Sequence, residues 1–307
     1  MNRHLTLLFS VLLSTSAFTQ TRPPITGISH IAVYASEPEN AEHYYVHDIG
    51  LFKGADPENP KGVRYYVNAK QFVEVLPLTA QDSPIRLDHL AYTTTDAEGL
   101  RAYLAAHKVD VPPTVEHGSD GSFYFRVKDP ESNVVEFVQS PPQAIALSGA
   151  NPIGHHIIHV GMHIINRDAE DTFYREILGF RPYWFGGAKP DTVEWVAQQV
   201  PDGRDWLEYM LSGVSTLSGA QTSAIQKQLG VLNHLSIGVT NIEQAVSTLD
   251  SEDRLNNEHY GPQIGRDGKW QCNLFDPDRT RLELMEFAPV KKPCCSPFTA
   301  PNPVPSE

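Results

Sequence analysis

The chain repeats one order of apolar and polar segments four times. Each copy opens with an apolar strand, continues into a helix with one apolar face and closes with further strands. Asp96, Asn166 and Asn241 stand where helix N-caps are expected, and Ser36 is the expected cap of the first helix. The four helices are expected at residues 38–48, 97–108, 167–178 and 242–249. A repeat longer than about 50 residues exceeds ordinary solenoid units, so the pattern predicts four small α+β modules.

Ionisable residues interrupt the apolar strands of every copy. In the second copy His89 lies in LDHLAYTT and Glu136 lies in NVVEFVQ. A side chain that can carry charge inside a buried strand destabilises the fold unless it is paired or binds a metal. The other copies carry the same two residue types on the same two strands: His30 and Glu74, His159 and Glu208, and His234 and Glu283. From histidine to glutamate the separations are 44, 47, 49 and 49 residues, so the eight residues follow one plan.

Proline and glycine divide the chain into two halves. Residues 140–154 contain three prolines and two glycines without a periodic apolar pattern, which indicates a linker. We therefore expect two domains, at residues 27–140 and 154–289, each made of two modules. Residues 290–307 are rich in proline and are expected to be disordered.

The N-terminus is typical of an export signal. Arg3 and His4 precede an apolar run from Leu5 to Leu13, and small residues follow it. Residues 1–19 are therefore expected to be a signal peptide. The mature chain is expected to be periplasmic or secreted, with no membrane contact after cleavage.

Composition narrows the class of partner. The 307 residues include 37 acidic and 24 basic ones, a formal net charge of −13, and no long run of Lys or Arg. Nucleic acid and anionic membrane surfaces are therefore poor partners. Three cysteines do not predict a disulfide scaffold, and the adjacent Cys294 and Cys295 cannot easily bridge each other without strain, so the state of these two thiols stays open.

The order strand, helix and three strands, with histidine on the first strand and glutamate on the last, resembles the vicinal oxygen chelate superfamily. That superfamily includes glyoxalase I, bleomycin-resistance proteins and extradiol dioxygenases, and the resemblance covers about residues 27–289. It implies an α+β fold in which four βαβββ modules pair into two glyoxalase-like, cup-shaped half-barrels. Pairing of the first module with the second and of the third with the fourth is the default. Pairing across the halves is the alternative.

The resemblance also implies a divalent metal in each cup. The expected ligands are His30, Glu74, His89 and Glu136 in the first half and His159, Glu208, His234 and Glu283 in the second. Imidazole and carboxylate ligands suit Ni, Co, Zn, Mn or Fe. The function implied is that of a lyase or isomerase acting on a small oxygen-rich molecule through a metal-bound enediolate. The expected catalytic bases are Glu136 and Glu283, with Glu74 and Glu208 as second choices.

Two other functions stay open. In an extradiol dioxygenase, His159, His234 and Glu283 would hold iron. The chain departs from that family at Glu208 and Asp267, where histidines are usual. A non-catalytic drug-binding protein would use the same cup without a metal, and the eight expected ligands argue against it. The partner in each case is a small molecule, and the chain is expected to be a monomer or homodimer. Aromatic residues that are candidates to line the cups are Tyr65, Tyr66, Phe123, Trp184, Trp195 and Trp270.

Overall fold

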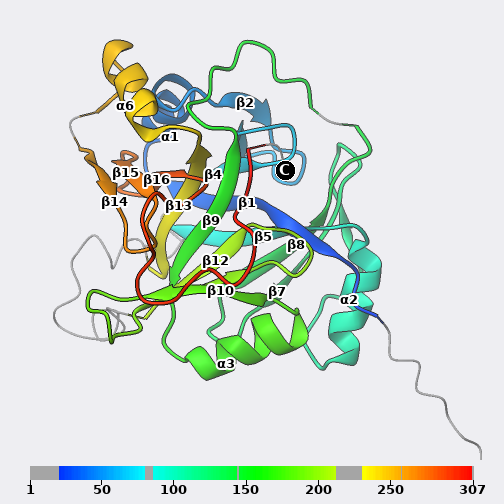
Figure 1. The fold of residues 1–307 in the computed structure, drawn as a ribbon. Helices are drawn as coiled ribbons and strands as arrows, with labels where there is room; N and C mark the ends of the chain where they lie inside the picture. Colours follow the sequence, from blue (N-terminus) through cyan, green and yellow to red (C-terminus); the bar gives the residue numbers. More distant parts are fainter. Residues whose placement is uncertain (1–20, 80–85, 144, 212–229, 257, 306–307) are drawn as a thin grey trace, which may run out of the picture.

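The computed structural model describes residues 21–79, 86–143, 145–211, 230–256 and 258–305 (Figure 1). The expected signal peptide at residues 1–19 lies outside the described residues. Among the helices that are described, none has the length and apolar character needed to cross a bilayer.

The first half of the chain forms one eight-stranded sheet. Its elements are β1 (Ile25–Ala35), α1 (Pro38–Glu42), a π-helical turn η1 (His43–Asp48), β2 (Phe52–Ala55), β3 (Val63–Tyr66), β4 (Phe72–Pro77), β5 (Leu87–Thr94), α2 (Ala97–Ala106), β6 (Glu116–His117), β7 (Phe123–Lys128) and β8 (Val134–Gln139). The strand order is β2-β3-β4-β1-β5-β8-β7-β6. The first strands of the two modules, β1 and β5, therefore pair antiparallel at the centre of the sheet.

The second half repeats this arrangement. Its elements are β9 (His156–His163), α3 (Arg167–Asp171), a π-helical turn η2 (Thr172–Ile177), β10 (Arg181–Gly186), β11 (Trp195–Gln199), β12 (Trp206–Met210), β13 (Leu232–Val239), α6 (Ile242–Ser251), β14 (Tyr260–Ile264), β15 (Trp270–Phe275) and β16 (Arg281–Glu286). The strand order is β10-β11-β12-β9-β13-β16-β15-β14. Each sheet thus takes two consecutive modules, which confirms the α+β half-barrel prediction and its default pairing.

Strand alternation sends apolar and ionisable side chains to opposite faces of each sheet. In β16, Leu282 and Leu284 enter the core, and Glu283 between them faces the other way. One core contains buried residues from both halves, and across it the rings of Tyr92 and Phe180 lie 5.2 Å apart. The histidines and glutamates are therefore collected on the face that the core leaves free.

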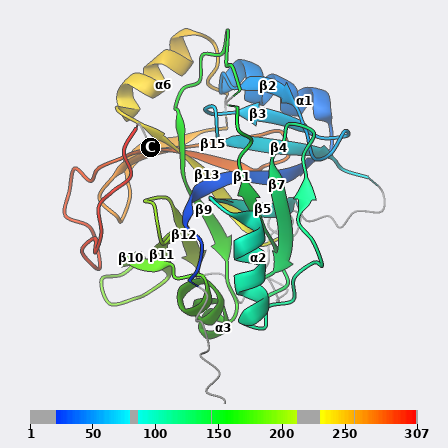
Figure 2. The ribbon, with the colours of Figure 1, turned by 90° about the vertical axis from the view of Figure 1, so that its right-hand side faces the viewer.

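Helices from different halves lie side by side around this core. Figures 1 and 2 both place α1 beside α6 and α2 beside α3. Arg254, at the end of α6, donates a hydrogen bond to the carbonyl of Asp48, and Tyr103 of α2 donates one to the carbonyl of Ile177. The two halves consequently share one packed interior.

The helix starts follow the sequence except at the first helix. Asp96, Asn166 and Asn241 each accept a hydrogen bond from a backbone N–H in the first turn of their helices. Ser36 does not cap α1. Its backbone N–H and its hydroxyl instead donate to Asp278 of the second half, because a carboxylate from the β15–β16 turn reaches this helix.

The C-terminal segment corrects one expectation and answers one open point. Residues 290–305 are not disordered but lie along β10, where the N–H of Cys295 donates to the carbonyl of Phe185 and the N–H of Thr299 to that of Tyr183. Hydrogen bonds to an edge strand supply the order that composition alone did not predict. Cys294 and Cys295, whose state the sequence left open, form a disulfide.

Candidate metal centres

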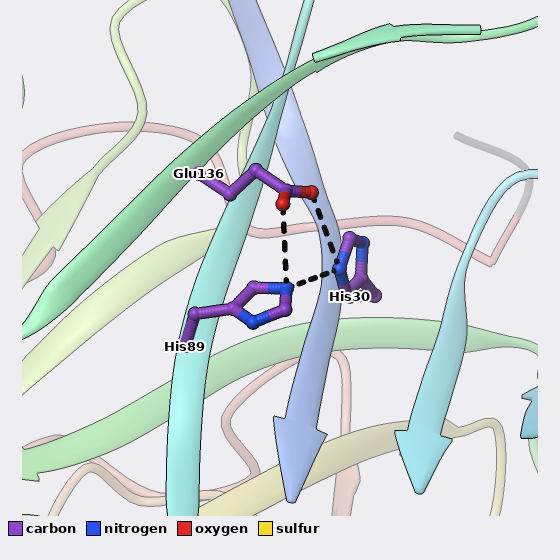
Figure 3. Close-up of side chains that lie close together, drawn as sticks. All are labelled: His30, His89 and Glu136. Atoms are coloured by element: carbon purple, nitrogen blue, oxygen red, sulfur yellow. Dashed lines mark hydrogen bonds and ion pairs between the residues drawn. The ribbon is translucent and has the colours of Figure 1, made fainter. Parts of the chain in front are cut away.

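The four candidate ligands of the first half converge on one point. They come from β1, β4, β5 and β8, and Figure 3 shows three of their side chains pointing toward one another. The Nε2 atoms of His30 and His89 lie 2.8 Å apart. Glu74 Oε2 lies 3.6 Å from each of these nitrogens, and the Glu136 oxygens lie 3.5 and 3.6 Å from them.

Burial sets the protonation of this first cluster. All four side chains are at most 1% exposed. Burial lowers the pKa of His30 and lowers that of His89 to about 4, so both imidazoles are neutral, the form in which histidine can bind a metal. Burial and the adjacent Asp56 carboxyl raise the pKa of Glu74 to about 10, and burial raises that of Glu136 to about 8. A cation is what would keep both carboxylates ionised.

The second half brings its four candidate ligands together in the same way. His159 Nε2 lies 2.7 Å from His234 Nε2 and 3.4 Å from Glu283 Oε2. His234 Nε2 lies 3.5 Å from Glu208 Oε2 and 3.8 Å from Glu283 Oε2. Burial lowers the pKa of both histidines and raises that of Glu208 to about 8. Two clusters of one chemistry therefore occupy the two cups.

Only the second cluster opens into a sizeable described cavity. A cavity of about 380 Å³ reaches all four of its residues, and Glu208 is the most accessible of them at 15% exposure. The aromatic side chains that line this cavity are Tyr183, Trp184, Trp195, Trp206 and Phe298. Trp184 and Trp195 were among the sequence candidates, but Trp206 and Phe298 were not. The first half has a cavity of about 410 Å³ beside Arg126, but none of the four ligand candidates lines it.

Cross-strand neighbours explain the difference in access. In the first half, Arg64 pairs across from Glu74 and Arg126 across from Glu136. The same register positions in the second half are Ala197, across from Glu208, and Asn273, across from Glu283. Long cationic side chains therefore cover the first cluster, and short side chains leave the second one open.

Glycine in β9 makes room for a ligand of the second cluster. Gly161 lies across from both Glu208 and His234, and a Cβ added to it would meet the His234 ring at 2.2 Å. Ala32 takes the corresponding place in the first half.

We expect Gly161→Ala to displace the His234 ring and weaken metal binding at the second cluster by about 10- to 100-fold, as loss of a residue that orients a ligand does. Metal titration followed by calorimetry measures this. Ala32→Gly, at the matched position, is the control. An unchanged affinity in Gly161→Ala would show that the ring has another way to fit.

A buried lysine lies behind the second cluster. Lys269 is fully buried, and its Nζ lies 4.5 Å from the ring centroid of Trp206 and 5.1 Å from that of Phe298. Burial lowers its pKa to about 8, although Asp267 and the two ligand glutamates act to raise it. Sequence patterns do not reveal this residue, because one lysine before a strand carries no periodic signal.

Raising the pH is expected to stabilise the chain relative to Lys269→Met. Between pH 8 and about 10.4 the unfolded chain keeps the lysine proton that the folded chain has released, so unfolding free energy rises with pH. Over this range the free energy of unfolding of the wild type rises by about 3 kcal/mol relative to that of Lys269→Met. Denaturant unfolding of both proteins at several pH values measures it. Parallel pH curves for the two proteins would contradict it.

The C-terminal segment forms one wall of the open cavity. Phe298 and Arg266 both line it. Arg266 accepts a hydrogen bond at its carbonyl from the N–H of Cys294, and its guanidinium donates to Cys294 Sγ. The disulfide pair thus lies beside a cavity residue.

Other histidines take structural or surface positions. His156 is buried, and its ring lies 2.7 Å from Asp205, which also accepts from the N–H of Ile28 in the first half. His43 and His47 are exposed beside Asp48 on η1.

Comparison with known proteins gives structural likeness without sequence likeness. No protein-family model and no curated protein matches the chain. The manganese-bound glyoxalase of Novosphingobium aromaticivorans superposes with a TM-score of 0.63 at 15% identity, over 86% of this chain and 83% of that one. The 2,3-dioxygenase LapB of Pseudomonas superposes at 0.62 and 15%, over 90% and 98%. A variant of homoprotocatechuate 2,3-dioxygenase from Brevibacterium fuscum gives 0.60 and 15%, over 87% and 72%. At this identity the likeness describes the fold.

Proposed function

We propose that this chain, whose fold is that of the tandem vicinal oxygen chelate proteins, is a divalent-metal-dependent enzyme that works in its second cup. The observation that carries the proposal is the cavity of about 380 Å³ that reaches His159, Glu208, His234 and Glu283. An enzymatic metal site keeps a position open for substrate, and this cluster is the accessible one.

The donor set of the second cup fits a divalent cation. Two neutral imidazoles and two carboxylates meet there within 2.7–3.8 Å of one another along the pairs given above. Ni, Co, Zn, Mn and Fe all accept such ligands. When bound, the cation would polarise a carbonyl oxygen and offset the negative charge that develops on it.

We assign the leading reaction as a lyase or isomerase step, in which a proton leaves the carbon beside a carbonyl. Glu208 is the base that the geometry favours because it is the most exposed of the four ligand candidates, so a substrate in the cavity can reach it. It would take the proton from one carbon and return it to the neighbouring one. Glu283 is only 5% exposed and is the second choice. Glu136, one of the two bases expected from the sequence, is excluded from solvent and paired with Arg126, so it does not fit that role.

The second candidate is a ring-cleaving dioxygenase. His159, His234 and Glu283 lie within 3.8 Å of one another, which is the two-histidine, one-carboxylate set of many iron oxygenases. The aromatic walls of the cavity would hold a planar ring. Glu208 and Asp267 stand where the dioxygenase pattern calls for histidines, and this keeps the candidate second. The eight ligand-type residues argue against a metal-free binding protein, which is therefore the third candidate function.

A substrate panel with the mature chain tests the proposal. The hemithioacetal of methylglyoxal, α-hydroxy ketones and catechols are each added to metal-loaded protein and to His234→Ala, with carbonyl absorbance and dissolved oxygen recorded together. Turnover without oxygen uptake, lost in His234→Ala, is the expected result. Oxygen uptake with catechols would contradict the isomerase proposal and support the dioxygenase. Ligand binding that is equal in both proteins, without turnover, would replace the enzyme by a binding protein.

Export stays part of the proposal. The basic start and apolar run of residues 1–19 support it. Cell fractionation with N-terminal sequencing of the recovered protein measures it, and an intact Met1 on a protein found only in the cytoplasm would contradict it.

A further inference from the structure

The first cup contains buried acceptors that lack a donor. Both oxygens of Glu74 and Oε1 of Glu136 are buried without a neutral or cationic donor among the described residues, and Glu74 has only the carboxyl of Asp56 beside it. Both side chains are at most 1% exposed, so bulk solvent does not reach them. A buried carboxylate without a donor or cation is strongly destabilising. Glu74 Oε2 and Glu136 Oε1 lie 3.5–3.6 Å from histidine Nε2 atoms, which places the missing partner between the four side chains; Figure 3 shows three of these, without Glu74.

The His89 ring presents a lone pair to that same point. Asp88 can only accept, so the contact of 3.3 Å between its Oδ2 and His89 Nδ1 puts the ring proton on Nδ1. His89 Nε2 then carries a lone pair and faces His30 Nε2 at 2.8 Å. His30 Nδ1 has its own partner in the Ser29 hydroxyl, at 3.1 Å. A cation between the two nitrogens turns this contact into shared ligation.

The buried charges of the cup leave room for two positive charges. Four carboxylates are at most 2% exposed there: Asp56, Glu58, Glu74 and Glu136. Two guanidinium groups face them. Arg64 lies 3.2 Å from Asp56 and 2.5 Å from Glu58, and Arg126 lies 2.6 Å from Glu136. With all four carboxylates ionised, the two guanidinium groups leave two negative charges, which one divalent cation would balance.

Arg126 also separates the cluster from solvent. Its side chain is 39% exposed and lines the cavity of about 410 Å³ in the first half, and its Nε donates to the fully buried Glu136. Asn273 stands at the matched register position of the open cup. The two cups therefore share a set of candidate ligands and differ in whether an arginine side chain covers it.

We propose that the first cup holds a divalent cation as a closed structural site, latched by Arg126, that neither exchanges freely nor meets substrate. Closed four-ligand sites stabilise folds, and sites with an open position do chemistry. The cation would join β1, β4, β5 and β8 at the centre of the first sheet. This site stands apart from the proposed reaction and is tested without turnover.

Metal analysis of the full chain tests the proposal. Protein made with equal supplies of Mn, Fe, Co, Ni and Zn is analysed by mass spectrometry before and after dialysis against EDTA. The wild type should carry about two metals per chain and keep about one. His234→Ala should keep the resistant metal, and Glu74→Gln should lose it.

Arg126→Asn gives the first cup the residue type that stands at the matched position of the second cup. It tests whether Arg126 keeps the metal from leaving. It should keep the metal before dialysis but release it to EDTA, with affinity lowered about 10- to 100-fold. The reciprocal Asn273→Arg should make the second metal resistant or exclude it. A resistant metal that survives Glu74→Gln, or a wild type without any resistant metal, would overturn the proposal. Should Glu74→Gln fail to fold, Arg126→Asn still tests the proposal. Equal EDTA resistance in Arg126→Asn and the wild type would show that Arg126 does not retain the metal.

Discussion

Glu208→Gln is expected to lower kcat by about 10²- to 10⁴-fold on whichever substrate the wild type converts, as removal of a general base does. Glutamine keeps the size of the side chain but cannot take a proton. His159, His234 and Glu283 remain to hold the metal, since their mutual contacts do not involve Glu208. Steady-state kinetics on metal-loaded protein measure the effect.

Metal content separates the base role from ligation alone. Glu208→Gln protein that retains its metal but not its turnover supports proton transfer by Glu208. Glu176→Gln, which alters an exposed glutamate on η2, is the control for the substitution itself. Full activity in metal-loaded Glu208→Gln would move the proton transfer to Glu283.

Asp278→Ala is expected to lower the free energy of unfolding by about 3–5 kcal/mol, because it leaves a buried guanidinium without its partner. Asp278 Oδ1 lies 2.8 Å from Arg86 Nη2, and the same carboxylate accepts from the N–H and hydroxyl of Ser36 at 2.8 and 2.5 Å. Both partners belong to the first half, so the substitution weakens the contact between halves. Urea unfolding followed by tryptophan fluorescence measures the loss.

The double variant Arg86→Met with Asp278→Leu tests the cause. Replacing a buried ion pair with apolar side chains of similar size is often neutral or stabilising, so the double variant should recover much of the stability. A double variant as unstable as Asp278→Ala would assign the loss to the Ser36 hydrogen bonds instead.

The four-module plan and the candidate metal ligands could be predicted from local sequence patterns. His89 and Glu136 stand out because each interrupts an apolar strand, and strand alternation with a period of two then assigns all four glutamates to the face opposite the core. Helix starts at Asp96, Asn166 and Asn241 followed from short polar side chains that satisfy free N–H groups. Both signals act over a few residues, so the sequence carries them intact.

The accessibility of the two clusters is determined by the tertiary structure. Arg126 and Asn273 are ordinary polar residues of a strand in the sequence, and only the cross-strand register sets each beside its glutamate. The same holds for Asp278, which reaches Ser36 across 242 positions, and for residues 290–305, whose order comes from β10. The sequence by itself determined the repeated module, the ligand set and the face on which it lies. Which cup is closed, which is open and how the halves are joined was decided by the fold, because these depend on contacts between strands and loops that are remote in the chain.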